Sequence, residues 1–365
     1  MLKFNNVELL ITDACNMNCK YCYGIQQPTF MSLQTAIDAI EWGMLRKKKE
    51  FLVIDLFGGE PMLNFEVIVA LYKHYLGRKD ITFHLFTNGT IWDDRLIPMI
   101  QDKSYFAIQL SIDGNKTTQN YQRPMNSGED SFQKVLDTCK KLQNSVSYDI
   151  HVKPVVCPNG IERLVEDVKF FVDEGFKIIG QSILRENVGD ELWTPERLKT
   201  FEKQLQNLSF YYEEVLRKGN PVVLSLLIDP VAGIIRKTDV ACWAGKSGMS
   251  IVHNGDIYPC ARFRKPHDIL GNIYKPFEYD EKTCYLAHRN LKNLACSECS
   301  IKDCCAGSCP EIQRSLMGSC CLPFPPVCEL YKIMSRVSSE LFARMKNHFL
   351  YREILTSALG GKWRG

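Results

Sequence analysis

Six short hydrophobic runs recur along the first half of the chain, and an amphipathic stretch separates each from the next. The runs are VELLIT (7–12), FLVIDLF (51–57), ITFHLF (81–86), YFAIQLSI (105–112), IHVKPVV (150–156) and FKIIGQSIL (176–184). Helical spacing of hydrophobic residues recurs over 32–48, 64–77, 131–144 and 160–174, and more weakly over 93–101. Strands that alternate with helices predict βαβ units with parallel strands. Six units favour an α/β fold, a partial (βα)6 TIM-like barrel, with a doubly wound sheet as the alternative.

The pattern changes in the second half of the chain. A long charged helix is expected over 195–218, and KGNP (218–221) ends it. Beyond this point the chain is rich in turn residues and poor in periodic segments, so metal would have to hold the region together. A last helix is expected over 329–348. We therefore predict a barrel over 1–220, a small cysteine-rich domain over 221–330 and a helical tail over 331–365.

Composition narrows the class of protein. The chain has 365 residues, of which 45% are hydrophobic and 24% charged, as in a globular protein with a core. The net charge of +3 is too small to indicate a nucleic-acid partner. No hydrophobic stretch approaches the ~20 residues of a membrane span, and the N-terminus lacks the order of a signal peptide. A cytoplasmic location is expected, where the sixteen cysteines indicate metal rather than disulfides.

Three cysteines follow directly after the first predicted strand. Cys15, Cys19 and Cys22 have the spacing CxxxCxxC, and the next histidine, His74, lies in a predicted helix, too far along the chain to complete a zinc knuckle. A four-iron cluster needs one outside ligand for each iron, and thiolates are the usual ones. Three cysteines would leave one iron open to a substrate, at the rim where parallel barrels build their active sites.

This spacing, with Tyr21 before the last cysteine, resembles the signature of the radical SAM superfamily. FGGEP (57–61), after the second strand, resembles the family segment that binds the methionine end of S-adenosylmethionine. TNGT (87–90) and SIDG (111–114) follow the third and fourth strands, where this family carries further cofactor contacts. The resemblance covers about residues 7–330.

The resemblance and the residue chemistry together predict a cofactor site. Paired glycines let a backbone approach a ligand closely, and Glu60 offers a carboxylate to an ammonium group. Asp113 either contacts the cofactor or caps the following turn, and Arg123 either binds an anion or lies on the surface. The predicted cofactor-binding residues are Tyr21, Gly58, Gly59, Glu60, Asn88, Ser111, Asp113 and Arg123.

The resemblance also implies the reaction. An external one-electron donor such as flavodoxin or ferredoxin would reduce the cluster on Cys15, Cys19 and Cys22, the metal ligands and catalytic residues. S-Adenosylmethionine would be cleaved reductively, and the resulting 5′-deoxyadenosyl radical would abstract a hydrogen atom from the substrate. The protein's own contribution would be positioning and the exclusion of water.

A second group of cysteines begins at Cys242, with four residues between Gly255 and Cys260, and continues with a CxxC pair at Cys296 and Cys299. Cys305, Cys309 and Cys328 complete it. This seven-cysteine spacing resembles that of the SPASM domain of radical SAM peptide maturases. The resemblance implies two auxiliary [4Fe–4S] clusters, three in all with the first. The first auxiliary set comprises Cys296, Cys299, Cys305 and Cys328; the second comprises Cys242, Cys260 and Cys309. The second set lacks a fourth ligand, so either a spare cysteine such as Cys284 completes it or one iron is open. The cysteines without an assigned role are Cys139, Cys157, Cys284, Cys304, Cys320 and Cys321.

The substrate is less constrained than the cofactor. The SPASM resemblance implies a peptide or protein side chain, with maturation of a ribosomally made peptide through a thioether or other cross-link as the main hypothesis. Formylglycine formation in a sulfatase is the alternative, although Ala261 stands where sulfatase-maturing members carry an aspartate. A small-molecule cofactor pathway and a non-enzymatic electron carrier are further hypotheses. Fourteen residues precede Cys15, so a leader peptide is expected to bind the barrel mouth or a separate protein.

Overall fold

The computed structural model describes residues 4–237, 242–276, 294–305 and 307–360. They form two compact units, each assembled from separate stretches of the chain. The first unit contains the described residues of Met1–Ser111, Arg123–Ile150 and Trp243–Arg289. The second contains those of Ile112–Gln122, His151–Cys242 and Asn290–Gly365. The boundaries at 220 and 330 stay predictions.

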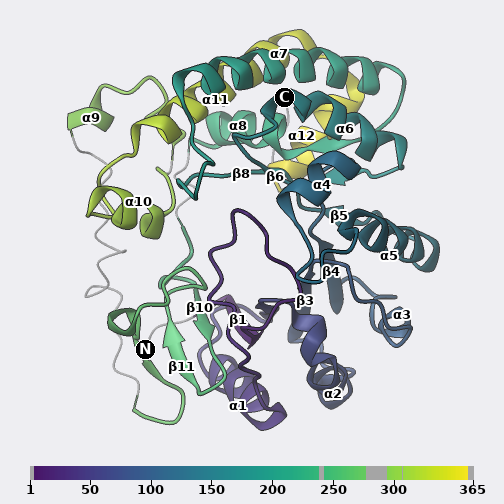
Figure 1. The fold of residues 1–365 in the computed structure, drawn as a ribbon, viewed down its shortest axis with the longest axis vertical. Helices are drawn as coiled ribbons and strands as arrows, with labels where there is room; N and C mark the ends of the chain where they lie inside the picture. Colours follow the sequence, from purple (N-terminus) through teal and green to yellow (C-terminus); the bar gives the residue numbers. More distant parts are fainter. Residues whose placement is uncertain (1–3, 238–241, 277–293, 306, 361–365) are drawn as a thin grey trace. The chain divides into compact units, whose positions relative to one another are not determined.

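The first unit is built on a sheet in which β1 lies between β2 and β10. Figure 1 labels β1 and β10 side by side. The pairs β10–β1, β1–β2, β2–β3 and β3–β4 are parallel, whereas β11 and β12 extend the edge antiparallel. The strands are β1 (Asn6–Thr12), β2 (Leu52–Gly58), β3 (Ile81–Thr87), β4 (Phe106–Leu110), β10 (Gly248–Ile251), β11 (Asp256–Tyr258) and β12 (Gly271–Asn272).

Helices of this unit follow the strands, as the alternating pattern predicts. Ser32 caps the first helix by accepting the N–H of Thr35 at 3.0 Å. That helix packs directly on β1, because a Cβ at Gly43 would lie 2.7 Å from Val7 Cγ2. The helices are α1 (Leu33–Met44), η1 (Pro61–Asn64), α2 (Phe65–Tyr75), α3 (Leu96–Met99), α5 (Ser131–Ser145) and η3 (Pro266–Asp268).

Each of the last two hydrophobic runs forms two short strands instead of one. Pro154 interrupts the run 150–156 because proline lacks the N–H that a strand ladder requires. The strands β5 and β7 pair in parallel, as do β7 and β9, and β6 pairs in parallel with β8. Their bounds are β5 (His151–Val152), β6 (Val155–Val156), β7 (Ile178–Ile179), β8 (Ser182–Ile183) and β9 (Val223–Leu224).

Helices make up most of the second unit. The predicted tail helix begins earlier, at Pro325, and a separate helix follows it. Two others, α8 and α10, were not expected from the turn-rich composition. The helices are α4 (Lys116–Gln122), η2 (Ile161–Arg163), α6 (Leu164–Asp173), α7 (Pro195–Arg217), α8 (Ser225–Arg236), α9 (Leu294–Ser297), α10 (Pro310–Met317), α11 (Pro325–Met345) and α12 (Phe349–Ala358).

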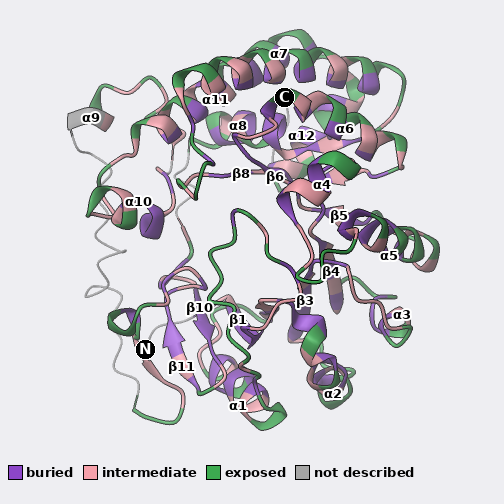
Figure 2. Ribbon diagram, viewed as in Figure 1, coloured by how far each residue is buried: buried purple, intermediate pink, exposed green. Residues whose placement is uncertain are grey.

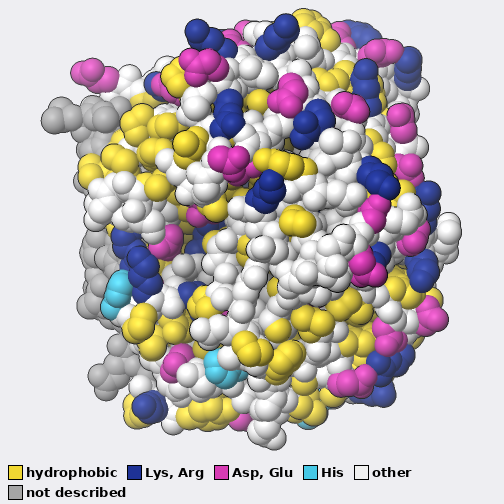
Figure 3. Space-filling view, viewed as in Figure 1, with side chains coloured by type: hydrophobic (Ala, Val, Ile, Leu, Met, Phe, Trp, Pro, Cys, Tyr) yellow, Lys and Arg dark blue, Asp and Glu magenta, His cyan; other side chains and the backbone are white. Residues whose placement is uncertain are grey.

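Burial follows the amphipathic pattern of these helices. In α7 the buried residues Phe201, Leu205, Leu208 and Tyr212 recur every three or four positions, and Figure 2 shows the opposite face of α7 exposed. Over α7, Figure 3 shows positive and negative side chains interspersed. The predicted α/β class with parallel strands is confirmed. Within the described residues, no helix combines the length and the hydrophobicity that crossing a bilayer requires.

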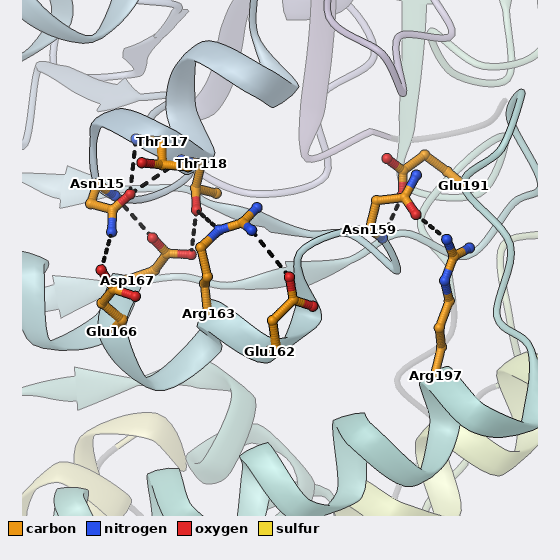
Figure 4. Close-up of polar contacts among 10 residues, drawn as sticks. All are labelled: Asn115, Thr117, Thr118, Asn159, Glu162, Arg163, Glu166, Asp167, Glu191 and Arg197. Atoms are coloured by element: carbon orange, nitrogen blue, oxygen red, sulfur yellow. Dashed lines mark hydrogen bonds and ion pairs between the residues drawn. The ribbon is translucent and has the colours of Figure 1, made fainter.

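A polar network fixes the segment that follows β4 onto α6 in the second unit (Figure 4). Asp167 accepts the N–H of Asn115 at 3.0 Å and the hydroxyl of Thr118 at 2.8 Å. A Cβ at Gly114 would lie 2.3 Å from Asp167 Oδ1, so the glycine of SIDG is required for this approach. Burial raises the pKa of Asp167 to about 7, although these hydrogen bonds and Arg163 oppose the shift.

This carboxyl predicts a pH dependence of stability. A folded-state pKa of about 7 lies above the usual 3.8, so the native state retains a proton that the unfolded chain has lost. Unfolding free energy should therefore fall as the pH rises from 4 to 7, by up to ~1.4 kcal/mol per pH unit. D167N should remove this component in urea titrations across that range. The exposed neighbour Glu166 supplies the control; equal slopes for D167N and E166Q would contradict the prediction.

Candidate functional site

The three cysteines at 15, 19 and 22 lie on one loop at the carboxyl end of β1, in the first unit. The N–H of Cys22 donates to the carbonyl of Cys19 at 3.0 Å, which closes a tight turn between them. Cys15 and Cys19 are half-buried, and Cys22 is exposed. Burial raises the pKa of the Cys15 thiol, and the nearby Glu60 and Cys22 act in the same direction.

Each of the three sulfur atoms has its own nitrogen donor. Asn88 Nδ2 lies 4.0 Å from Cys15 Sγ, and Arg123 Nη1 lies 3.9 Å from Cys19 Sγ. The backbone N–H of Gly24 donates to Cys22 Sγ at 3.3 Å. Donors directed at sulfur stabilise thiolates, the ionised form that binds iron. The sequence had indicated Asn88 and Arg123 for this site, but not Gly24.

The paired glycines at the end of β2 hold the start of this loop. A Cβ at Gly58 would lie 2.1 Å from the carbonyl oxygen of Thr12, and one at Gly59 would lie 2.2 Å from that of Ala14. The N–H of Gly59 donates to Thr12 and that of Glu60 to Ala14, each at 2.8 Å. The backbone that these glycines approach is therefore that of the cysteine loop.

Glu60 is completely buried and joins the ends of β2 and β3. Its Oε1 accepts the hydroxyl of Thr87 at 2.7 Å and the N–H of Met62 at 2.9 Å, and its Oε2 accepts the N–H of Asn88 at 2.7 Å. Burial raises the pKa of this carboxyl, and the hydrogen bonds oppose the shift. Glu60 thereby fixes the backbone of the residue whose side chain reaches Cys15.

The segment after Arg123 braces the loop from a second side. Asn126 Nδ2 donates to the carbonyl of Cys15 at 3.0 Å, and the N–H of Asn18 donates to Pro124 at 2.9 Å. Sequence reasoning missed this brace because nothing in PMN (124–126) distinguishes it from a surface loop.

Asn16 links the loop to TNGT and was also missed. It donates to Thr90 Oγ1 at 2.8 Å and accepts from Asn88 Nδ2 at 2.9 Å. Its place between two of the cysteines was the signal that could have pointed to it.

The other predicted cofactor residues have different surroundings. Tyr21 is buried, and the guanidinium of Arg123 lies 5.3 Å from the centre of its ring. Ser111 is half-buried, and its N–H donates to the carbonyl of Thr87 at 2.9 Å. Asp113 lies in the second unit, where its Oδ1 accepts the N–H of Val155 at 2.9 Å. This bond gives the Asp113 carboxylate a structural partner on the segment after β5.

Two arginines from the loop after β11 contact the cysteine loop within the first unit. Arg264 forms two hydrogen bonds with the carboxylate of Asp13, at 3.1 and 3.0 Å. The guanidinium of Arg262 lies 3.8 Å from the centre of the Tyr23 ring. Both arginines follow Cys260 closely, so the chain around this cysteine is attached to the loop of the first triad.

A buried carboxylate lies beneath the same connection. Glu8 accepts the N–H of Ala261 at 2.9 Å and the hydroxyl of Ser250 on β10. Burial raises its pKa to about 7, and the nearby Asp55 adds to the shift. Sequence reasoning missed Glu8 because an acid within a hydrophobic run reads as an outward-facing residue.

The comparisons with known proteins agree with this geometry. Residues 9–171, which include the triad, GGEP, TNGT and SIDG, match the model of the Radical SAM superfamily. The chain carries a radical SAM domain. Among curated relatives, the cysteine-type anaerobic sulfatase-maturating enzyme of Clostridium perfringens is 26% identical over 89% of this chain and 94% of its own. The radical SAM cyclopropyl synthase TigE of Paramaledivibacter caminithermalis is 22% identical over 94% of this chain and 75% of its own.

Solved structures agree with the fold. The structure of hexahistidine-tagged anSMEcpe with bound AdoMet superposes with a TM-score of 0.80 at 20% identity, over 98% of both chains. Streptococcus suis SuiB bound to S-adenosylmethionine gives a TM-score of 0.66 at 16% identity, over 89% of this chain and 77% of that one. The fold of this chain is thus the one predicted, that of a radical SAM protein with a cysteine-rich C-terminal region.

The residues of the radical SAM domain fit the [4Fe–4S] cluster and S-adenosylmethionine that this family implies. Three thiols on one loop, each with a nitrogen donor, suit anionic sulfur ligands. No group of three His, Cys, Asp or Glu side chains in the described part of the chain is close enough to share a single metal ion. A cluster of four irons is larger than one ion, and its thiolates stand correspondingly further apart.

Four cysteines of the second unit lie near one another, as the SPASM resemblance implied. Burial raises the pKa of Cys328 to about 11, and the charges of Cys305, Cys296 and Cys299 contribute to the increase. The N–H of Gly307 donates to Cys305 Sγ at 3.3 Å, which repeats the arrangement of Gly24 at the first triad. That these four cysteines hold an auxiliary cluster stays a prediction, and their proximity to one another supports it.

The second auxiliary set is not resolved in the same way. Cys260 belongs to the first unit, whereas Cys242 and Cys309 belong to the second, so this set stays a prediction. Cys284, the candidate fourth ligand, lies outside the described residues. Among the unassigned cysteines, Cys139 and Cys157 are buried and Cys304, Cys320 and Cys321 are half-buried.

Proposed function

We propose that this protein is a radical SAM maturase that modifies side chains of a ribosomally made peptide, forming a thioether or another cross-link. The observation that carries the proposal is the triad loop. Three cysteines lie at the carboxyl end of β1, each with a nitrogen donor beside its sulfur, and no fourth cysteine lies on that loop. Such a set leaves one coordination site of a cubane cluster to a substrate or cofactor.

Different residues position the cysteine loop and the nitrogen donors that face its sulfurs. Gly58 and Gly59 fix the backbone of Thr12–Ala14, and Glu60 fixes the N–H of Asn88. Asn88 and Arg123 then direct nitrogen donors toward two of the sulfurs. When bound, the cluster and S-adenosylmethionine would supply radical chemistry for hydrogen abstraction. Donors on the sulfurs tune the reduction potential of such a cluster.

Names of related proteins support a peptide substrate. Sporulation killing factor maturation protein SkfB of Bacillus subtilis is 25% identical over 38% of this chain. SuiB has been solved bound to the precursor peptide SuiA, with a TM-score of 0.63 at 14% identity. An enzyme also explains the GGEP and TNGT contacts better than the electron-carrier hypothesis, since a carrier needs no cofactor rim. Two auxiliary clusters, an external electron donor and a separate leader-binding protein remain part of this proposal.

The cross-link hypothesis predicts a mass loss in a peptide. Purified and reconstituted without oxygen, the protein should convert S-adenosylmethionine to 5′-deoxyadenosine in the presence of a strong reductant. A peptide encoded beside its gene, co-expressed with it, should lose two hydrogens per cross-link by mass spectrometry. A cluster-loaded protein that forms no 5′-deoxyadenosine would refute the enzyme, and an unchanged peptide mass would refute the cross-link.

Sulfatase maturation is an equally strong second candidate, because the sulfatase-maturating relative matches nearly the full length of both chains. Native anSMEcpe has also been solved with a Cp18Cys peptide, at a TM-score of 0.77 and 22% identity. Ala261 stands at the position where an aspartate is expected in sulfatase-maturing members of the family, and its N–H donates to Glu8. Incubation with the Cp18Cys peptide distinguishes the two candidate functions, because a formylglycine product carries an aldehyde group that hydrazide reagents detect.

A further inference from the structure

The second unit contains a cavity of about 380 Å³ at the carboxyl ends of its strands. Lys153 follows β5, Gln181 follows β7 and Ser225 follows β9, and all three line the cavity. Helices α8 and α11 complete the wall, and every lining residue belongs to this unit. The volume falls in the range of small-molecule and peptide side-chain sites.

Two opposite charges line this cavity without contacting each other or another charged group. Neither the side chain of Lys153 nor that of Asp229 forms a hydrogen bond or a salt bridge with any other residue that the structure describes. Lys153 is half-buried, and Asp229, on α8, is an exposed residue of the cavity lining. Burial lowers the pKa of Lys153 and raises that of Asp229, and each charge partly offsets the shift of the other. The ammonium of Lys153 is partly removed from water, and such a charge without a partner is costly unless a ligand pairs with it.

A buried amide adds a donor to the same wall. Gln181 is 7% exposed, and its Oε1 accepts the N–H of Leu226 at 3.3 Å. Its Nε2 is buried and has no hydrogen-bond partner among the described residues. Nearby, Arg185 Nη1 donates to the hydroxyl of Tyr331 at 3.3 Å, which holds a second cation at the cavity. Donors thus concentrate around Lys153, and Asp229 supplies the acceptor.

The cavity is distinct from the predicted cluster site beside it. Cys305 lines the cavity, but Cys296, Cys299 and Cys328 do not. Cys304 faces the cavity with Ile301 and Met334, which form an apolar part of the wall.

We propose that this cavity binds a dipolar ligand, one that carries a carboxylate and an ammonium group on a short scaffold. The carboxylate would pair with Lys153 and the amide of Gln181, and the ammonium with Asp229. This inference rests on the proposed function, under which the natural source of the dipolar ligand is a segment of the peptide substrate with neighbouring acidic and basic side chains. A free amino acid has the same chemistry and is the other source.

Binding of small probes to the cluster-loaded, full-length protein tests the proposal. Anaerobic titration calorimetry would compare the dipolar capped dipeptide acetyl-Glu-Lys-amide, its neutral analogue acetyl-Gln-norleucine-amide, and free alanine. The dipolar dipeptide should bind at least ~10-fold more tightly than the neutral one, as expected when charge-assisted hydrogen bonds are lost. Preference for the dipeptide supports a peptide source, and preference for alanine supports a free amino acid. Equal binding of the neutral analogue would overturn the proposal.

Variants locate the binding within the cavity. K153M and D229N should each weaken the dipolar probe by at least ~10-fold, whereas K153R should restore most of the affinity of K153M. K203M is the matched control, since Lys203 lies exposed on α7 of the same unit and does not line the cavity. Iron content and circular dichroism would show that K153M and D229N are folded. Unchanged binding in both would place the ligand elsewhere and overturn the inference.

The outcome can be separated from that of the proposed function. Formation of 5′-deoxyadenosine by the wild type and by K203M reports on the radical SAM activity alone. If these proteins cleave S-adenosylmethionine but K153M binds the dipolar probe like the wild type, the cavity inference fails and the function stands. If they do not cleave it but binding depends on Lys153 and Asp229, the function fails and the site stands.

Discussion

Replacing Cys15, Cys19 and Cys22 together by alanine will abolish cleavage of S-adenosylmethionine and leave the auxiliary iron bound. We expect total iron to fall from ~12 to ~8 atoms per chain, since three cubane clusters hold four irons each. The triad loop belongs to the first unit, whereas Cys296, Cys299, Cys305 and Cys328 belong to the second. Loss of one loop's ligands therefore leaves the other set intact. Iron analysis and chromatographic detection of 5′-deoxyadenosine measure both effects.

The matched control removes two other cysteines. Cys139 and Cys157 are buried and belong to none of the three predicted ligand sets, so alanine at both positions should leave iron content and cleavage near wild type. Cleavage that persists in the triple variant would refute the role assigned to the triad. A complete loss of iron would instead show that the auxiliary sets cannot hold clusters by themselves.

Glu60→Ala will lower the unfolding free energy by about 3 kcal/mol or more, because it leaves three buried donors unpaired at ~1–3 kcal/mol each. It will also reduce S-adenosylmethionine cleavage at least ~100-fold, because the site loses its positioning. Those donors are the Thr87 hydroxyl and the N–H groups of Met62 and Asn88. The Asn88 backbone would lose its anchor, and its side chain would lose its position near Cys15. Glu60→Gln should fall between the wild type and alanine, because the amide keeps one accepting oxygen.

Glu66→Ala provides the comparison on the same stretch of chain. Glu66 is exposed on α2 and pairs with Arg95 at 2.7 Å, and surface pairs of this kind contribute little to stability. Thermal unfolding followed by circular dichroism, together with 5′-deoxyadenosine assays, would rank the variants. If Glu60→Ala unfolds at the same temperature as Glu66→Ala, the buried hydrogen bonds are not the anchor that the structure indicates.

The alternating hydrophobic pattern predicted the strands of the first unit closely. The runs at 7–12, 51–57 and 81–86 correspond to β1 (Asn6–Thr12), β2 (Leu52–Gly58) and β3 (Ile81–Thr87). In β1 every residue but the first is buried, as in a strand that is covered on both faces, so its hydrophobic pattern is strong. The two-residue strand β9 has no such hydrophobic pattern. The strand β10 pairs with β1, which lies more than two hundred residues earlier in the chain, so the sequence did not indicate this pairing.

The candidate site was predictable where spacing carries the chemistry. The cysteine spacing identified the triad, and FGGEP and TNGT identified the ends of the next strands. The roles of individual residues were not predictable in the same way. Gly58 and Gly59 approach the cysteine loop, and Asp113 accepts the N–H of Val155. These partners are distant in sequence, so no local pattern indicates the contacts.

Local periodicity and spacing were sufficient to predict the α/β class, the triad and the order of the segments that surround it. The tertiary structure decided which groups face the sulfurs: Asn88, Arg123 and Gly24 reach three different cysteines. It also decided that Lys153 and Asp229 line one cavity. Such contacts depend on how parallel strands bring their carboxyl ends to one edge, and no local pattern encodes which side chains meet there.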